Sequence, residues 1–162
     1  MKINETFQYE GVSAEDVYGL VSSEEFRTES AEAQMSLELD LSVELNGDGH
    51  TISIKRRLPA ELPDFIKRLT GDTVEVHQLE EWSGPSADGS RTAKVVVKVI
   101  GQPASMKGTS TIAPAGDGAT MTIAGDVEVK IPLIGRKVEP EIAKTILRSI
   151  RQEVELGTSK FE

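Results

Sequence analysis

Hydrophobic and polar residues alternate along several stretches of the chain, as they do in strands that bury one face. The most regular alternation covers residues 35–45 and places six hydrophobic side chains on one face: Met35, Leu37, Leu39, Leu41, Val43 and Leu45. Further alternation predicts strands over residues 2–10, 51–58, 73–82, 91–100, 105–113 and 119–132. The stretches are separated by turn-forming residues such as Asn46-Gly47-Asp48-Gly49, which predict hairpins and hence an antiparallel sheet.

Two segments with helical spacing follow the first strand. Ser13-Ala14-Glu15-Asp16 resembles a capping box with Asp16 in place of Glu or Gln, and Ser23 begins a second start signal. We therefore expect two short helices between residues 14 and 34.

A third helical pattern lies near the C-terminus, where hydrophobic residues recur every four positions: Val138, Ile142, Ile146, Ile150 and Val154. This is the apolar stripe of one long helix. Because proline is accepted only in a first turn, Pro140 predicts that the helix begins near Val138. Gly157 either ends this helix or weakens it.

These elements predict an α+β fold, with a single domain over residues 1–162. Seven strands joined by hairpins form a curled antiparallel sheet. The last helix, roughly 30–36 Å long, matches strands of up to about 40 Å and can pack on the concave face. Between residues 59 and 71, Leu62, Phe65, Ile66 and Leu69 predict a short helix, either the lid of a cavity or an ordinary crossover.

Composition and charge remove several classes of function. The chain has a formal net charge of −9, which argues against nucleic acid or an anionic membrane surface as the main partner. No run of hydrophobic residues exceeds three, so we expect no stable membrane insertion. The N-terminus is polar and acidic, and a cytoplasmic location is the default expectation.

The sequence contains no recognisable catalytic or metal-binding motif. Cysteine is absent, which excludes thiol nucleophiles and Cys–zinc sites. His50 and His77 are far apart, and both are expected on the surface. Asp88 stands where a nucleophile elbow would need glycine. We therefore assign no catalytic residue, metal or cofactor.

The order of strand, two short helices, six-stranded meander and long C-terminal helix resembles the helix-grip fold of the START-like (SRPBCC) superfamily. Phe7-Gln8-Tyr9 ahead of Val17 is similar to the opening of these domains. Further residues of the chain resemble an uncharacterised family within the superfamily: Leu62-Pro63-Asp64-Phe65, Gly71, Trp82 and Ile131-Pro132-Leu133-Ile134-Gly135. The resemblance implies a deep apolar cavity, used by relatives for lipids, sterols, polyketides or hormones, but it implies no activity.

The alternation also predicts which side chains point inward, toward such a cavity or toward a filled core. As ligand-binding candidates we name Tyr9, Leu39, Ile54, Arg56, Phe65, Val76, Gln78, Glu80, Trp82, Val97, Met106, Met121, Ile123, Ile142 and Ile146. Gly108 and Gly125 fall on the same inward face, where they either leave room or mark a bend.

Three polar residues share the parity of the inward hydrophobic positions: Arg56, Gln78 and Glu80. A charge in an apolar space costs several kcal/mol unless it is paired. In the functional interpretation, these three residues form a polar anchor for one end of a ligand. Alternatively they lie in water at the end of the sheet, or a bulge at Leu79 reverses the parity.

Three functions remain open at this stage. The leading hypothesis is a binding or carrier domain for a small apolar molecule. The second is a polyketide cyclase-, dehydratase- or hydrolase-like enzyme in which Glu80 or Glu5, with its pKa raised by burial, acts as base or acid. The third is an interaction module without a ligand, as a monomer or homodimer.

Overall fold

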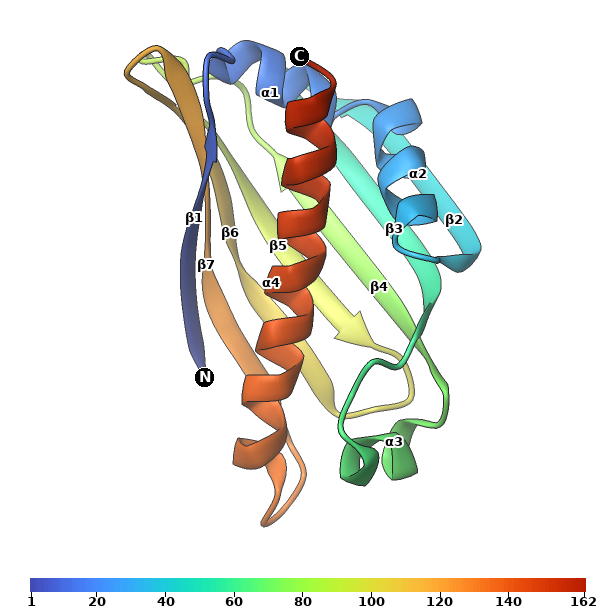
Figure 1. Cartoon of the computed structure of the whole chain (residues 1–162). Coiled ribbons are helices and arrows are strands. Elements are labelled where there is room, and N and C mark those ends of the chain that lie inside the picture. Colours follow the sequence, from blue (N-terminus) through green and yellow to red (C-terminus); the bar gives the residue numbers. More distant parts are fainter.

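The computed structural model describes the whole chain, residues 1–162, as one curved sheet partly enclosed by helices (Figure 1). The elements in chain order are β1 Lys2–Tyr9, α1 Ala14–Val21, α2 Glu24–Ala33, β2 Leu37–Asn46, β3 Gly49–Pro59, α3 Asp64–Thr70, β4 Thr73–Trp82, β5 Arg91–Val99, β6 Ala104–Ala115, β7 Gly118–Val129 and α4 Gly135–Ser159.

All seven strands belong to one antiparallel sheet with the order β1-β7-β6-β5-β4-β3-β2. Figure 1 shows α4 running across the concave side of this sheet, with α1 near one end of the strands and α3 at the other. The long helix packs mainly on β1 and β7, and it meets α2 on its other side. This arrangement is the α+β helix-grip fold predicted from the sequence.

The two short helices begin where the serine signals placed them. Ser13 Oγ accepts a hydrogen bond from the Asp16 main-chain N–H at 3.1 Å, and Ser23 Oγ accepts one from the Phe26 N–H at 3.2 Å. Each serine thereby satisfies a donor that the first turn of a helix leaves free.

The start of α4 differs from the prediction. The helix begins at Gly135 rather than near Val138, so Pro140 is its sixth residue and only the carbonyl of Arg136 loses its usual donor. The preceding strand also ends early, at Val129 instead of residue 132, because Val129 pairs with Ala104, the first residue of β6. Leu133, in the turn between this strand and α4, has a φ of +72°.

Gly157 lies inside α4 and does not end it. A Cβ atom at this position would lie 3.1 Å from Tyr9 Oη and 2.9 Å from Leu20 Cδ2. The glycine therefore allows the last turns of α4 to approach β1 and α1 more closely than a side chain would permit.

The alternation over residues 35–45 is interrupted in the structure. Leu37 pairs with Arg57 and Asp40 with Lys55, so two residues of β2 lie opposite Arg56, and Glu38 has a φ of +49°. This bulge at the beginning of an edge strand leaves Leu37 53% exposed. Met35 lies before the strand and is also exposed, so neither side chain points inward as the pattern predicted.

His50 is not a free surface residue as expected. Its Nδ1 atom lies 2.6 Å from Tyr18 Oη, and the two rings pack with their centroids 5.6 Å apart. Tyr18 also packs edge-on against Trp82. These aromatic contacts hold α1 against the sheet.

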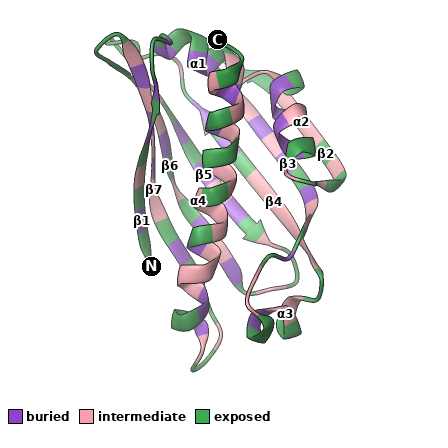
Figure 2. Cartoon of the chain, in the orientation of Figure 1, coloured by how far each residue is buried: buried purple, intermediate pink, exposed green.

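Buried hydrophobic residues form two apolar clusters. Figure 2 marks the buried positions on the ribbon, along the strands and on the helices. The larger cluster joins residues of the sheet to α1 and to Ala143 and Val154 of α4. The smaller one lies near α3 and contains Ile66, Ala104, Val129 and Val138. The four helices are all too short or too polar to cross a lipid bilayer.

Gly108 and Gly125 face each other across β6 and β7. A Cβ atom on Gly108 would lie 2.1 Å from the carbonyl oxygen of Ala124, and one on Gly125 would lie 2.6 Å from that of Lys107. The pair thus marks a place where the two curved strands come too close for side chains.

We predict that Gly108→Ala destabilises the protein by about 1–3 kcal/mol, because the added methyl group must displace main-chain atoms of β7. Urea unfolding followed by circular dichroism measures this loss. The control is Gly19→Ala in α1, where a Cβ meets no atom within 4 Å and helix propensity should add about 0.5–1 kcal/mol. Equal stability of Gly108→Ala and wild type would contradict the close approach.

Candidate functional site

A cavity of about 160 Å³ lies between α4 and the concave face of the sheet. Hydrophobic side chains make up 22 of its 35 lining residues. The sheet contributes residues of β3 to β7, and Ile142, Ile146 and Ile150 of α4 form the opposite wall.

The cavity is closed at one end and open at the other. At the end near α1 and α2, its lining residues Val21, Arg27 and Trp82 are all buried. At the end near α3, the lining includes Glu61 and Leu69, which are exposed. A molecule entering the cavity would therefore pass the α3 end.

Most of the candidates named from the sequence line this cavity. They are Arg56, Val76, Gln78, Glu80, Trp82, Val97, Met106, Met121, Ile123, Ile142 and Ile146. The register between β3 and β4 is continuous from Pro59–Thr73 to Thr51–Glu81, so no bulge at Leu79 reverses the parity.

Four candidates are not among the residues that line the cavity. Tyr9 packs against Gly157 near the C-terminal end of α4, and Ile54 belongs to the larger apolar cluster. Leu39 is one of the two bulge residues of the edge strand β2, where it is only half-buried. Phe65 is 44% exposed on the outer side of α3, while its neighbour Ile66 points into the cavity.

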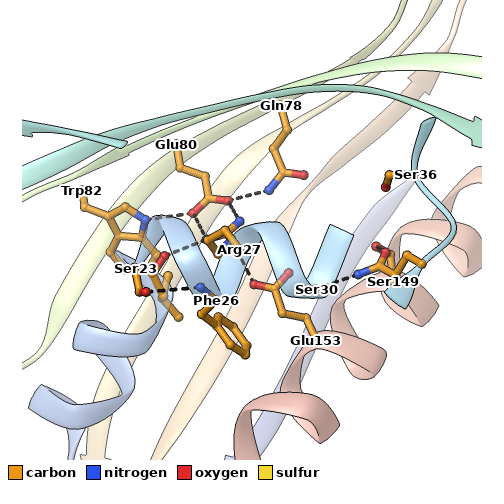
Figure 3. Close-up of polar contacts among 12 residues, drawn as sticks. Ser23, Phe26, Arg27, Ser30, Ser36, Gln78, Glu80, Trp82, Ser149 and Glu153 are labelled. Carbon is orange, nitrogen blue, oxygen red and sulfur yellow. Dashed lines mark hydrogen bonds and ion pairs between the residues drawn. The ribbon is translucent and has the colours of Figure 1, made fainter. Parts of the chain in front are cut away.

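Polar residues gather at the closed end around the carboxylate of Glu80 (Figure 3). Arg27 donates to both of its oxygens, through Nη1 at 3.2 Å and through Nη2. Trp82 Nε1 donates to Oε1 at 2.9 Å, and Gln78 Nε2 donates to Oε2. Both oxygens of the buried Glu80 carboxylate thus accept hydrogen bonds, which come from three side chains.

Arg27 joins this carboxylate to α4. Its Nε atom lies 3.1 Å from Oε1 of Glu153, and Nη1 also donates to the Val21 carbonyl at 3.2 Å. Burial alone would lower the pKa of Arg27, but the Glu153 and Glu80 carboxylates raise it above its usual value. The guanidinium is therefore a permanent cation shared by two carboxylates.

The environment of Glu80 keeps it ionised. Burial alone would raise its pKa, but Arg27 and the hydrogen bonds from Trp82 and Gln78 hold the pKa below its ordinary value. The expectation that burial raises the pKa of Glu80 enough for acid–base catalysis is therefore wrong. Glu5, the other proposed base, lies outside the cavity and pairs with Arg151 on α4 at 3.3 Å.

Arg56 also lines the cavity, but its surroundings are different. Its only hydrogen bond runs from Nη1 to Ser36 Oγ at 3.4 Å, and its buried Nε has no partner. Burial lowers the pKa of Arg56 from its ordinary value, an effect that Glu153 and Glu80 only partly oppose.

The sequence reasoning missed the polar residues that come from helices. Thr145, Ser149 and Glu153 all line the cavity, and they recur every four residues beside the isoleucine stripe of α4. That spacing was a readable signal of a second, polar stripe on the inner face. Arg27 shares a helix face with Ser30 and Ala31, both small and buried, which gives a weaker signal.

The chain contains no group of three or more His, Asp or Glu side chains placed to hold a metal ion. The chemistry available in the cavity is therefore that of an apolar wall, a fixed ion cluster and one less satisfied arginine.

We predict that Arg27→Met destabilises the protein by about 3–5 kcal/mol, because it leaves the buried Glu80 carboxylate without its cation. Chemical denaturation gives the change in unfolding free energy. Arg57→Met, on the opposite face of the sheet with a half-buried side chain, should cost only about 0–1 kcal/mol. Similar losses in both variants would refute a special role for Arg27.

We also predict a pH dependence that originates in Glu80. Because its folded-state pKa is depressed, its stabilising effect is present above about pH 4.5 and is lost as the pH falls toward the folded-state pKa. The difference in unfolding free energy between wild type and Glu80→Gln should be constant from about pH 5 to 7 and shrink below about pH 4.5. Glu81→Gln, the next carboxylate on β4, is the control. A difference that persists unchanged to about pH 3 would contradict this assignment.

Comparison with known proteins finds relatives that are similar in sequence and solved structures that are similar in fold. An uncharacterized protein of Mycobacterium tuberculosis, strain H37Rv, is 24% identical over 159 residues, which cover 93% of this chain and 90% of the relative. Among solved structures, a START superfamily protein from Mycobacterium smegmatis matches with a TM-score of 0.61 at 15% identity, covering 99% of both chains. A norcoclaurine synthase point mutant from Thalictrum flavum, in complex with a transition-state analogue, matches with a TM-score of 0.57 at 15% identity, covering 100% of this chain and 96% of that one.

The matches to solved structures establish the START-like fold. The match to a sequence-family model establishes the family. Residues 5–159 match the model of a family described as a protein of unknown function, DUF2505. The chain therefore belongs to the DUF2505 family, an uncharacterised family within the START-like fold.

Proposed function

We propose that this protein binds a small, mainly apolar molecule in the cavity beneath α4 and carries it shielded from water. The observation that supports this most directly is an apolar space that is closed at one end and open at the other. A protein interior is normally packed to the density of an organic crystal, so a space of this size in a single domain calls for an occupant.

The volume of the cavity sets a scale for the ligand. A dry cavity of about 150 Å³ is large enough to hold benzene. About 160 Å³ therefore suits a single ring or a short length of alkyl chain, and a longer molecule would extend past Leu69 at the open end. Each Å² of apolar surface removed from water would contribute roughly 25 cal/mol to binding.

We propose that the apolar part of the ligand contacts the middle of the cavity. The residues concerned are Val76, Val97, Met106, Met121, Ile123, Ile142 and Ile146. Its polar part would face Arg56, Gln78 and Glu80 near the closed end, with Trp82 as the end wall.

The structural neighbours support a ligand-binding role. The norcoclaurine synthase structure holds a transition-state analogue, so a chain of this fold accommodates a small molecule. The START superfamily protein from Mycobacterium smegmatis matches 99% of this chain over 99% of its own length.

A carrier fits the site better than an enzyme that relies on a buried carboxylate. The cavity is lined by three carboxylates, Glu61, Glu80 and Glu153. Glu61 is exposed at the open end, where Arg148 pairs with it at 3.3 Å, and the other two are bound to Arg27. General acid–base catalysis needs a group that exchanges its proton near neutral pH, and a carboxylate held by a permanent cation does not do so.

We predict that native mass spectrometry of the protein purified from its own cells shows a bound small molecule. Val97→Phe, which places a larger ring in the cavity, should remove most of this bound mass. Val96→Phe, at the neighbouring position on the opposite face of β5, should retain it. An unliganded mass for the wild type, with no gain on exposure to a library of lipids and aromatic compounds, would overturn the proposed function.

A further inference from the structure

We infer that the ligand carries a single anionic group, of the carboxylate class, and that the Arg56 guanidinium binds it inside the cavity. This inference rests on the proposed function and names the chemistry of the ligand's polar end. It is carried by the contrast between two buried arginines that line the same space.

Arg27 and Arg56 are buried to a similar extent, 4% and 8% exposed, but they are satisfied very differently. Arg27 is bound by Glu80 and Glu153 and by the Val21 carbonyl. Arg56 forms no ion pair, and of its five N–H donors only one, on Nη1, reaches a partner, the Ser36 hydroxyl at 3.4 Å. Its buried Nε–H has no hydrogen-bond acceptor. The Arg27 Nε–H has none either, but that nitrogen lies 3.1 Å from a carboxylate oxygen of Glu153 and Arg56 has no carboxylate at such a distance.

The charged groups that line the cavity are therefore unevenly paired. Arg27 pairs with the buried Glu80 and with Glu153, whose side chain is 19% exposed, and Arg56 is left as a cation without a bonded anion. An unpaired buried charge destabilises a folded protein, and the lowered pKa of Arg56 reflects the same deficit. An anion on the ligand would supply the missing partner.

The backbone around Arg56 gives a second, independent observation. The bulge in β2 places two residues, Glu38 and Leu39, opposite Arg56 in the neighbouring strand. Bulges occur next to binding sites, where they redirect a side chain or end regular pairing. Here the irregularity coincides with the one arginine of the cavity that lacks a counter-ion.

The shape and charge of the guanidinium favour a carboxylate. Its planar set of donors matches the two oxygens of a carboxylate in a bidentate contact. One unpaired cation calls for a single negative charge, whereas a phosphate monoester carries about −1.5 to −2. With its anion on Arg56, the apolar part of the ligand would lie between Val76 of β4 and Ile146 of α4.

Isothermal titration of the full-length, delipidated protein with decanoate, decanol and decylamine tests the inference. The three probes share one alkyl chain and differ in the charge of the head group. We expect decanoate to bind at least about tenfold more tightly than decanol, and decylamine to bind more weakly than either.

Variants of adjacent arginines provide the matched comparison. Arg56→Met should bind decanoate and decanol equally, and because it removes an unpaired buried charge it should melt no lower than wild type. Arg56→Lys keeps the charge without the planar donors and should retain part of the preference for decanoate. Arg57→Met, which alters the solvent side of the same strand, should bind all three probes like wild type.

The possible outcomes separate the inference from the proposed function. Equal affinity of the wild type for decanoate and decanol would overturn the inference while leaving a carrier of apolar molecules in place. An unchanged preference for decanoate in Arg56→Met would also overturn it. Failure of all three probes, together with an unliganded mass from the native source, would overturn both.

Discussion

The ion cluster around Arg27 is the interaction on which the closed end of the molecule depends. It connects three elements that are distant in the sequence, namely α2 through Arg27, β4 through Glu80 and α4 through Glu153. A charged group in this position would be costly if it were alone, and the donors from Trp82 and Gln78 complete the set of partners. The positions of α2 and α4 relative to β4 are therefore fixed by ion pairs at this end of the molecule.

The same cluster makes the closed end of the cavity polar. Apolar side chains of the sheet and of α4 leave space between them, since the chain is poor in aromatic residues that could fill it, at 4% of the sequence. At the open end, Arg148 of α4 pairs with Glu61. A molecule that enters past α3 would pass this ion pair and then the apolar walls, and it would meet the Arg27 cluster last.

Much of the fold could be read from the sequence because its strands bury one face only. Alternation placed Arg56, Gln78 and Glu80 on the inner side of the sheet, where the structure has them. It failed at the start of β2, because a bulge is set by local backbone geometry that leaves no mark in the hydrophobic pattern. The partners of Glu80 were missed for a different reason: Arg27 and Glu153 come from helices whose pairing depends on how they pack against the sheet, which the spacing of residues along the chain does not determine.

The two glycines near the ends of α4 have a consequence for how the cavity beneath the helix can vary. At Gly135 a Cβ would lie 2.2 Å from the Val129 carbonyl oxygen of β7, and at Gly157 it would lie 3.1 Å from Tyr9 Oη of β1. Each end of the helix is therefore in direct contact with a strand of the sheet. These two end contacts thereby set the distance between the middle of α4 and the sheet, and the side chains in the middle of the helix do not. Exchanges among the isoleucines between these ends would then change the volume and shape of the cavity while the positions of the helix and the sheet stay the same.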